Sequence, residues 1–185
     1  MLSFINQGLE DFSISRQAGR GHGWGVPVPG DPNQVMYVWV DALSNYITAL
    51  DYAEDGELFQ RYWLNNPNRV HVVGKDIIRF HVIYWPAMLM AANLPTPSKV
   101  NVHECLTHNG EKMSKSRGNV VDPVVLVDQY GSDAVRYWLL RDMPRTSDGD
   151  FSYQRLEDRY NTDLANDLGN LINRTVGMLH RFKGG

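Results

Sequence analysis

Short apolar runs and longer helical patterns alternate along the first half of the chain. Three runs of β-branched and aromatic residues have the length of buried strands: residues 35–40 (VMYVWV), 69–73 (RVHVV) and 99–105. Apolar residues recur at helical spacing in three segments: residues 41–50, 56–64 and 77–93. Asp76 is suited to cap the last of these helices, and Pro86 is expected to bend it. This alternation predicts an α/β fold.

The pattern changes after the third predicted strand. Gly, Asn, Ser and Lys fill residues 106–121, which predicts a long polar loop, as the Gly and Pro of residues 20–33 do earlier in the chain. Two short helices are expected after Pro123, separated by Gly131 and with Ser132 as a cap.

A longer helical pattern closes the chain. After a polar linker, an apolar stripe runs through residues 153–182 at the spacing of a helix in a bundle. The chain is therefore expected to hold the end of an α/β domain and the start of an α-helical domain. A doubly wound sheet usually has about five or six strands, so three strands suggest that part of the sheet is missing. A helix stripe without partners should leave exposed apolar patches.

Composition narrows the possible classes. The 185 residues are 43% hydrophobic and carry a formal net charge of -3, which excludes disorder and gives no general attraction to nucleic acid. The only cysteine, Cys105, forms neither an intramolecular disulfide nor a multi-cysteine zinc site, so no metal is expected in this segment. The sequence has no signal peptide and no membrane span, and we expect a soluble, cytoplasmic protein without a membrane partner.

A cationic string on the predicted loop carries the candidate chemistry. The Walker phosphate loop, the dinucleotide fingerprint and the zinc-protease motif are all absent. Residues 110–119 read GEKMSKSRGN, with three cations between two glycines. Short charge runs of this kind are usually solvated surface, and that interpretation stands as the alternative.

The KMSKS string at residues 112–116 is the signature of class I aminoacyl-tRNA synthetases, and the chain resembles the methionyl-tRNA synthetase family along essentially its whole length. The segments GLEDFSISR, WGVPVPGDP, YVWVDALSNY, HVVGKDIIRFHVIYWPAMLMA, DGDFS and NTDLANDLGNLINRTVGML carry this resemblance. It implies the C-terminal half of a Rossmann-like nucleotide-binding sheet with the KMSKS loop in residues 1–122. It also implies an α-helical junction in residues 123–150 and the first helix of an anticodon-binding bundle in residues 151–185.

The resemblance implies roles in ATP binding and catalysis. Charge that develops on the phosphates during amino-acid activation would be met by mobile lysines, and Lys115 would be the main stabiliser with Lys112 beside it. Arg16 corresponds to an arginine that faces the family's active site; a surface arginine is the alternative. The residues implied in ATP binding are Gly74, Asp76, Lys112, Met113, Ser114, Lys115 and Ser116. From the pattern alone, Gly74 ends a strand and Asp76 caps a helix.

The resemblance also implies a methionine pocket. A thioether suits an aromatic and apolar pocket, and the family takes these residues from two helices. They correspond here to Trp39, Ala42, Leu43, Tyr46, Ile77, His81 and Trp85. Some members have proline where Leu43 stands, a change that keeps the wall apolar. Periodicity alone would assign the same residues to a core.

The family's other signature, a His-Ile-Gly-His-type segment, is absent from the sequence. We therefore expect part of a methionine-tRNA ligase that binds methionine, ATP with Mg²⁺ and tRNA(Met) in the intact enzyme and is inactive without the N-terminal half of the catalytic domain. One alternative is a truncated, non-catalytic paralogue that binds methionine, a nucleotide or a protein partner. Another is a structural or assembly module.

Overall fold

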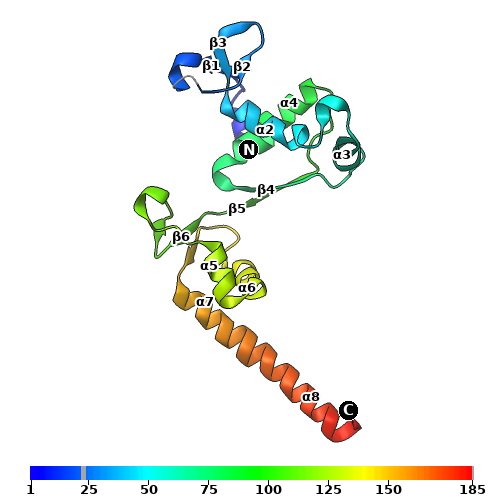
Figure 1. The fold of residues 1–185 in the computed structure, drawn as a ribbon, viewed down its shortest axis with the longest axis vertical. Helices are drawn as coiled ribbons and strands as arrows, with labels where there is room; N and C mark the ends of the chain where they lie inside the picture. Colours follow the sequence, from blue (N-terminus) through cyan, green and yellow to red (C-terminus); the bar gives the residue numbers. More distant parts are fainter. Residues whose placement is uncertain (22–23, 185) are drawn as a thin grey trace. The chain divides into compact units, whose positions relative to one another are not determined.

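A computed structural model describes residues 1–21 and 24–184, and the chain divides into two compact units, Met1–His103 and Glu104–Gly185 (Figure 1). Helices and strands are mixed within both units, which confirms the predicted α/β class. The expected division at residues 122 and 150 stays a prediction.

The first unit begins with helix α1 (Leu2–Asn6) and a small antiparallel sheet in the order β1-β3-β2. Its strands are β1 (Ser15–Gln17), β2 (Pro27–Val28) and β3 (Asp31–Met36), with a 3-10 turn, η1 (Ala18–Gly21), after β1. The expectation of loop throughout residues 20–33 is therefore wrong in part; residues 22 and 23 lie outside the described residues. Gly30, at φ +81°, makes the tight turn that joins β2 to β3.

The strand predicted over residues 35–40 is also displaced. The strand ends at Met36, and helix α2 (Val38–Thr48) begins two residues later. The β-branched Val38 and Val40 favour a strand locally, but packing overrides this preference because Leu43 and Ile47 of the same helix are buried in the core. The helical prediction for residues 41–50 is confirmed.

The unit also contains a two-stranded parallel sheet, β4 (Val70–Gly74) and β5 (Lys99–His103), in the predicted places. The helical segments around it are η2 (Tyr52–Glu54), α3 (Glu57–Phe59), η3 (Gln60–Leu64), η4 (Lys75–Ile77), η5 (Phe80–Tyr84) and α4 (Trp85–Ala91).

The connection from β4 to β5 differs in detail from the prediction. Gly74 occupies the N-cap position and Asp76 lies inside the first turn, because the helical turn starts directly where the strand ends. Pro86 stands in the first turn of α4, immediately after the π-helical segment η5. A wider turn suits a residue that has no N–H to donate.

The core of the first unit joins α2 to the helices on either side of β4. Its buried side chains are Leu43, Ile47, Phe59, Trp63, Trp85 and Leu89. Strand β4 contributes on one face only: His71 and Val73 are buried, whereas Val70 and Val72 are exposed.

The second unit opens with a sheet in the order β7-β6-β8. Its strands are β6 (Leu106–His108), β7 (Glu111–Lys112) and β8 (Gly149–Phe151). The expectation of one long loop over residues 106–121 is wrong, because Asn109 and Gly110 both have positive φ, 52° and 78°, and close a two-residue hairpin. The strand β8 lies in what was expected to be a linker and pairs with β6 in parallel.

Helices make up the rest of the second unit. They are α5 (Pro123–Tyr130), α6 (Ser132–Asp142), α7 (Tyr153–Arg159), the π-helical segment η7 (Tyr160–Leu168) and α8 (Gly169–Lys183), with a 3-10 turn η6 (Lys115–Arg117) before them. The predicted helices are present, but Ser132 is the first residue of α6 and not its cap, which is Gly131. The buried core is Leu126, Val135, Trp138, Phe151 and Leu156.

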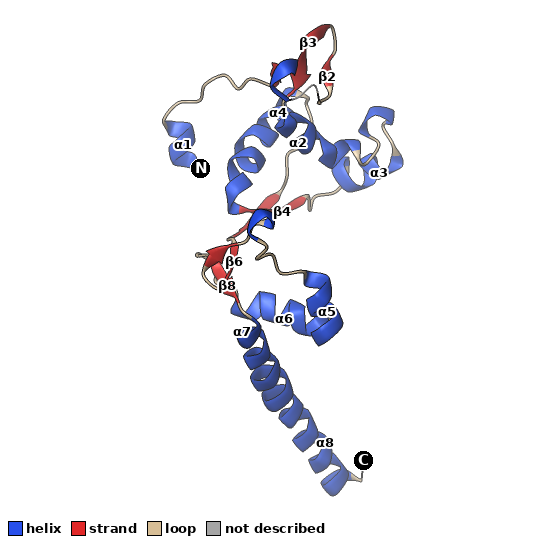
Figure 2. Cartoon of the chain, turned by 60° about the vertical axis from the view of Figure 1, so that its left-hand side comes forward, coloured by secondary structure: helices blue, strands red, loops and turns tan. Residues whose placement is uncertain are grey.

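The last three helical segments form one long helix (Figure 2). Most of its apolar residues beyond α7 are exposed, as expected of a stripe without partners: Leu168, Leu171, Ile172, Val176, Met178, Leu179 and Phe182. No described helix is long and apolar enough to span a membrane.

Candidate active-site elements

The KMSKS residues lie on a loop that follows the β6–β7 hairpin. Lys112 is the last residue of β7 and Lys115 is the first residue of η6, and both are exposed. Met113 turns inward and packs against the core of the second unit. The loop thus presents two cations to solvent from a backbone that is attached to the core between them.

The Asn119 side chain closes this loop. Its Oδ1 accepts the Ser114 N–H at 2.8 Å, and its Nδ2 donates to the Lys112 carbonyl at 3.2 Å. Gly118 adopts φ +68°, the left-handed conformation that lets the chain turn back. Ser114 and Ser116 share a hydroxyl-hydroxyl hydrogen bond of 2.8 Å.

The hairpin that carries the loop is anchored by Asp150 on strand β8. Its Oδ1 accepts the Thr107 hydroxyl at 2.6 Å and the Gly110 N–H at 2.7 Å. These two hydrogen bonds hold the pKa of Asp150 below its ordinary value. The carboxylate therefore ties the turn of the hairpin to a strand far along the chain.

Removing this carboxylate should loosen the hairpin. Hydrogen bonds to a charged group contribute roughly 1.5–3 kcal/mol each. Because Asp150 is only half-buried and water replaces part of the loss, we expect Asp150→Ala to cost about 2 kcal/mol of local stability in all and to speed hydrogen exchange at Gly110 about 30-fold. Acid should act in the same direction, because a carboxyl with a lowered pKa stabilises the fold above its ordinary pKa and loses that contribution as the pH falls through the lowered one.

Glu111→Ala is the matched control, because Glu111 is an exposed carboxylate of the same hairpin and pairs with Arg117 across a long 4.0 Å contact. Equal exchange rates at Gly110 in the two variants would contradict the anchoring role.

A cluster of aromatic and histidine side chains forms the second candidate element, in the first unit. Helix α2 contributes Trp39 and Tyr46, and the helix after β4 contributes His81 and Trp85. The Tyr46 hydroxyl lies 2.8 Å from His81 Nε2, and the Trp39 and His81 rings meet edge to face with centroids 6.3 Å apart. The structure thus brings together residues that the sequence places on two separate helices.

The hydrogen bonds of His81 fix which of its ring nitrogens donates and which accepts. Its Nδ1 donates to the Ile77 carbonyl at 2.9 Å, because a carbonyl only accepts. In the neutral ring Nε2 then accepts from the Tyr46 hydroxyl. Burial raises the pKa of Tyr46, so this hydroxyl keeps its proton.

The other residues of the predicted methionine pocket are placed unevenly. Leu43 and Trp85 are each 1% exposed and belong to the core, whereas Ala42 is exposed and Ile77 is half-buried. Trp39 stacks on Phe80, with centroids 3.9 Å apart and planes at 10°. Contact with a ligand stays a prediction for this group.

Arg16 lies on β1, Gly74 at the end of β4, and Asp76 in the 3-10 turn η4. Arg16 Nη1 donates to the Ser13 and Ser15 carbonyls at 3.0 and 2.7 Å, and its guanidinium lies 3.8 Å from the centre of the Tyr37 ring. Gly74 ends β4, where a Cβ would lie an ordinary 3.6 Å from the His103 ring. The end of a parallel strand is a usual ligand position in open α/β sheets.

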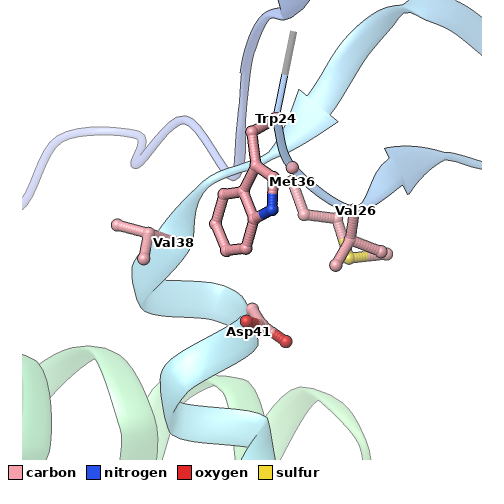
Figure 3. A pocket seen from close by; sticks show the side chains of 6 residues that line it. Trp24, Val26, Met36, Val38 and Asp41 are labelled. Carbon is pink, nitrogen blue, oxygen red and sulfur yellow. The ribbon is translucent and has the colours of Figure 1, made fainter. Parts of the chain in front are cut away.

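Two open cavities adjoin the first unit's helices. One, of about 350 Å³, lies at the start of α2, and Figure 3 shows the Trp24 indole above it between Val38 and Met36 with Asp41 below. The other, of about 480 Å³, has Tyr46 and His71 in its wall. Within residues 1–21 and 24–184 no three His, Cys, Asp or Glu side chains are grouped to hold a metal ion.

Sequence reasoning missed several residues that support these elements. The Asn109-Gly110 pair is the strongest short signal for a hairpin and was available from the sequence. Asn119 and Asp150 were not, because both act on residues brought near by folding. His71 gave no signal beyond an inward position on a strand.

The sequence matches the family profile described as tRNA synthetases class I (M) over residues 1–176. Curated relatives named methionine-tRNA ligase from Halalkalibacterium halodurans and Bacillus subtilis are 57% and 54% identical to it over 184 residues, which is 99% of this chain. The chain spans only about a quarter of these relatives, 27% of their length.

Solved structures agree with the sequence relatives. The Mycobacterium tuberculosis methionyl-tRNA synthetase in complex with methionyl-adenylate matches at a TM-score of 0.82 and 52% identity, over 96% of this chain and 34% of that one. The apo form of that synthetase matches at 0.78 and 46% identity, over 100% of this chain and 34% of that one.

Proposed function

This chain belongs to the class I tRNA synthetases (M), and we propose that it supplies part of the active site with which a methionine-tRNA ligase activates methionine and charges tRNA(Met). One observation carries the proposal: the complete KMSKS string lies on a loop whose Lys112 and Lys115 are exposed while Asn119 and Asp150 fasten its base. A basic loop that is merely solvated surface would need neither the Asn119 nor the Asp150 hydrogen bonds.

The proposed reaction explains why two lysines are useful there. A carboxylate oxygen of methionine attacks the α-phosphorus of ATP, a new O–P bond forms, and the bond to the leaving pyrophosphate breaks. ATP enters as its Mg²⁺ complex. Lys115, with Lys112, stabilises negative charge on the phosphates as it builds up, and the loop residues Met113, Ser114 and Ser116 shape the ATP site. The glycine-flanked loop closes over ATP and opens for release.

The aromatic cluster is the proposed methionine pocket. Sulfur against ring edges gains about 1 kcal/mol, and this cluster offers several rings around few polar groups. The proposed contacts are Trp39, Ala42, Leu43, Tyr46, Ile77, His81 and Trp85. The Tyr46–His81 hydrogen bond supports the assignment, because it holds the main polar atoms in one fixed arrangement.

The remaining assignments complete the proposed site. Gly74 and Asp76, at the end of β4, receive the adenosine part of ATP, and Arg16 faces the reacting groups. In the intact enzyme, residues 1–122 are the second half of the catalytic domain, 123–150 a helical junction and 151–185 the start of the anticodon-binding helices. The missing first half would bring the His-Ile-Gly-His-type segment. We place the enzyme in the cytoplasm, because a sequence with a single cysteine, Cys105, is compatible with a reducing compartment.

A chimera tests the proposal. This chain replaces the matching 184 residues of the Halalkalibacterium halodurans relative, and methionine-dependent ATP–pyrophosphate exchange is measured. We expect the chimera to exchange within about tenfold of the unmodified relative, because at 57% identity the site residues should be met by their usual neighbours. The 185-residue chain by itself should show no exchange.

Two outcomes would count against the proposal. Exchange by the chain alone would show that the missing half is not needed. A folded chimera that binds methionine without exchange would favour the non-catalytic paralogue.

A further inference from the structure

We propose that His71 is a positioning residue of the methionine pocket, which holds the Trp85 indole and the Tyr46 ring in the orientation that methionine meets. The inference rests on the proposed function and adds to it a residue on strand β4 that does not belong to the predicted pocket. His71 acts through its neighbours and is not itself a ligand contact.

The first contact is a buried hydrogen bond. The Trp85 indole N–H donates to His71 Nε2 at 3.1 Å, where Trp85 is 1% and His71 8% exposed. An indole nitrogen only donates, so Nε2 carries no proton and the ring has its proton on Nδ1. Trp85 thus has one buried polar atom, and His71 satisfies it.

The second contact is with the other helix of the pocket. The Tyr46 and His71 rings lie with centroids 4.3 Å apart, while the Tyr46 hydroxyl bonds His81. His71 therefore contacts a ring from α2 and a ring from α4 at once. The two histidines make different contacts. His81 is hydrogen-bonded to the Tyr46 hydroxyl, whereas His71 contacts the Tyr46 ring and accepts the Trp85 indole N–H.

The acceptor on His71 persists through the physiological pH range. Burial, and then the neighbouring His81 ring 5.8 Å away, lower the pKa of His71 to about 4. A neutral imidazole keeps Nε2 free to accept. Because the indole N–H is bonded to His71, the rest of the Trp85 ring is carbon, which suits a thioether.

The kinetic test uses two variants of the chimera. His71→Leu removes the acceptor, and His71→Gln keeps one near the position of Nε2. We expect His71→Leu to raise the KM for methionine about tenfold with kcat and the KM for ATP within about twofold, and His71→Gln to restore the KM to within about threefold.

Val73→Ala is the matched control for general damage to the core. Val73 is 4% exposed, lies on the same face of the same strand, and leaves the Trp85 hydrogen bond intact. A methionine KM that is unchanged in His71→Leu, or that rises equally in Val73→Ala, would overturn the proposal. Should the leucine variant not fold, His71→Asn shortens the acceptor and should raise the same KM.

A second measurement separates this proposal from the proposed function. The Trp85 indole N–H resonance, assigned through Trp85→Phe in the 185-residue chain, should shift in His71→Gln and either shift or be lost in His71→Leu. If the indole resonance shifts in these variants but the chimera has no exchange activity, the His71–Trp85 hydrogen bond is supported and the ligase assignment is contradicted. If the Trp85 indole resonance does not shift, the positioning role of His71 is contradicted even when the chimera is active.

Discussion

Replacing Lys115 by alanine in the chimera is expected to slow methionine-dependent ATP–pyrophosphate exchange by about 10²–10³-fold, while the KM for methionine stays within about twofold. The reason is that this ammonium group would meet charge that exists only as the phosphates pass through the transition state. Lys115 is exposed at the start of η6, so its removal should cost little stability.

Arg117→Ala is the control for this experiment. It removes the same charge from the same 3-10 turn, and the Arg117 side chain makes a 4.0 Å ion pair with exposed Glu111. We expect exchange in Arg117→Ala to stay within about threefold of the chimera, since exposed ion pairs contribute little. An equal loss in both variants would mean that the loop acts through its net charge. An unchanged rate in Lys115→Ala would remove the role assigned to that lysine.

Replacing Asp142 by alanine is expected to lower the free energy of unfolding of the second unit by about 3 kcal/mol. The Asp142 side chain is 8% exposed and accepts from Arg155 Nε at 3.0 Å and Nη2 at 2.8 Å, and from Arg159 Nε at 3.1 Å. These bonds join the end of α6 to α7. Both arginines are partly exposed and regain water, which keeps the cost at the lower end of that for a broken buried pair.

The measurement is a urea titration of the chain followed by hydrogen exchange of peptides from residues 132–168. Asp158→Ala serves as the control, because this exposed carboxylate lies on α7 and accepts a hydrogen bond from the exposed Gln154 side chain. It should change the free energy of unfolding by about 0.5 kcal/mol or less. If Asp142→Ala lowers the free energy of unfolding no more than Asp158→Ala does, the ion pairs of Asp142 contribute nothing specific to the stability of the second unit.

The sequence predicted helices better than strands, because a helix depends on residues close together along the chain whereas strand pairing depends on distant ones. The stripe through residues 153–182 and the parallel strands β4 and β5 stand where the pattern placed them. The hairpin β2–β3 and the strand β8 do not show in periodicity, because their partners and turns decide them. At Val38 the local preference for a strand was overridden by the buried face of α2.

The candidate site shows the same limit. Helical spacing places Ile77, His81 and Trp85 on one stretch of helical chain, and this grouping needs only neighbouring residues. The bond from Tyr46 to His81 crosses 35 residues, so only the folded chain reveals it. The KMSKS string identified the loop by resemblance, whereas its attachment through Asp150 follows from strand pairing that no local pattern encodes.

The attachment of the hairpin to Asp150 also sets an order of assembly. Thr107 and Asp150 are 43 residues apart along the chain, so the loop between them must close before the bond can form. Helices α5 and α6, which lie within that loop, form from nearer contacts and should form first. During translation, Lys112 and Lys115 are synthesised before Asp150, the residue that anchors their hairpin. The loop therefore acquires its final shape only after β8 has been synthesised, when Phe151 packs against Trp138 and draws Asp150 to the turn.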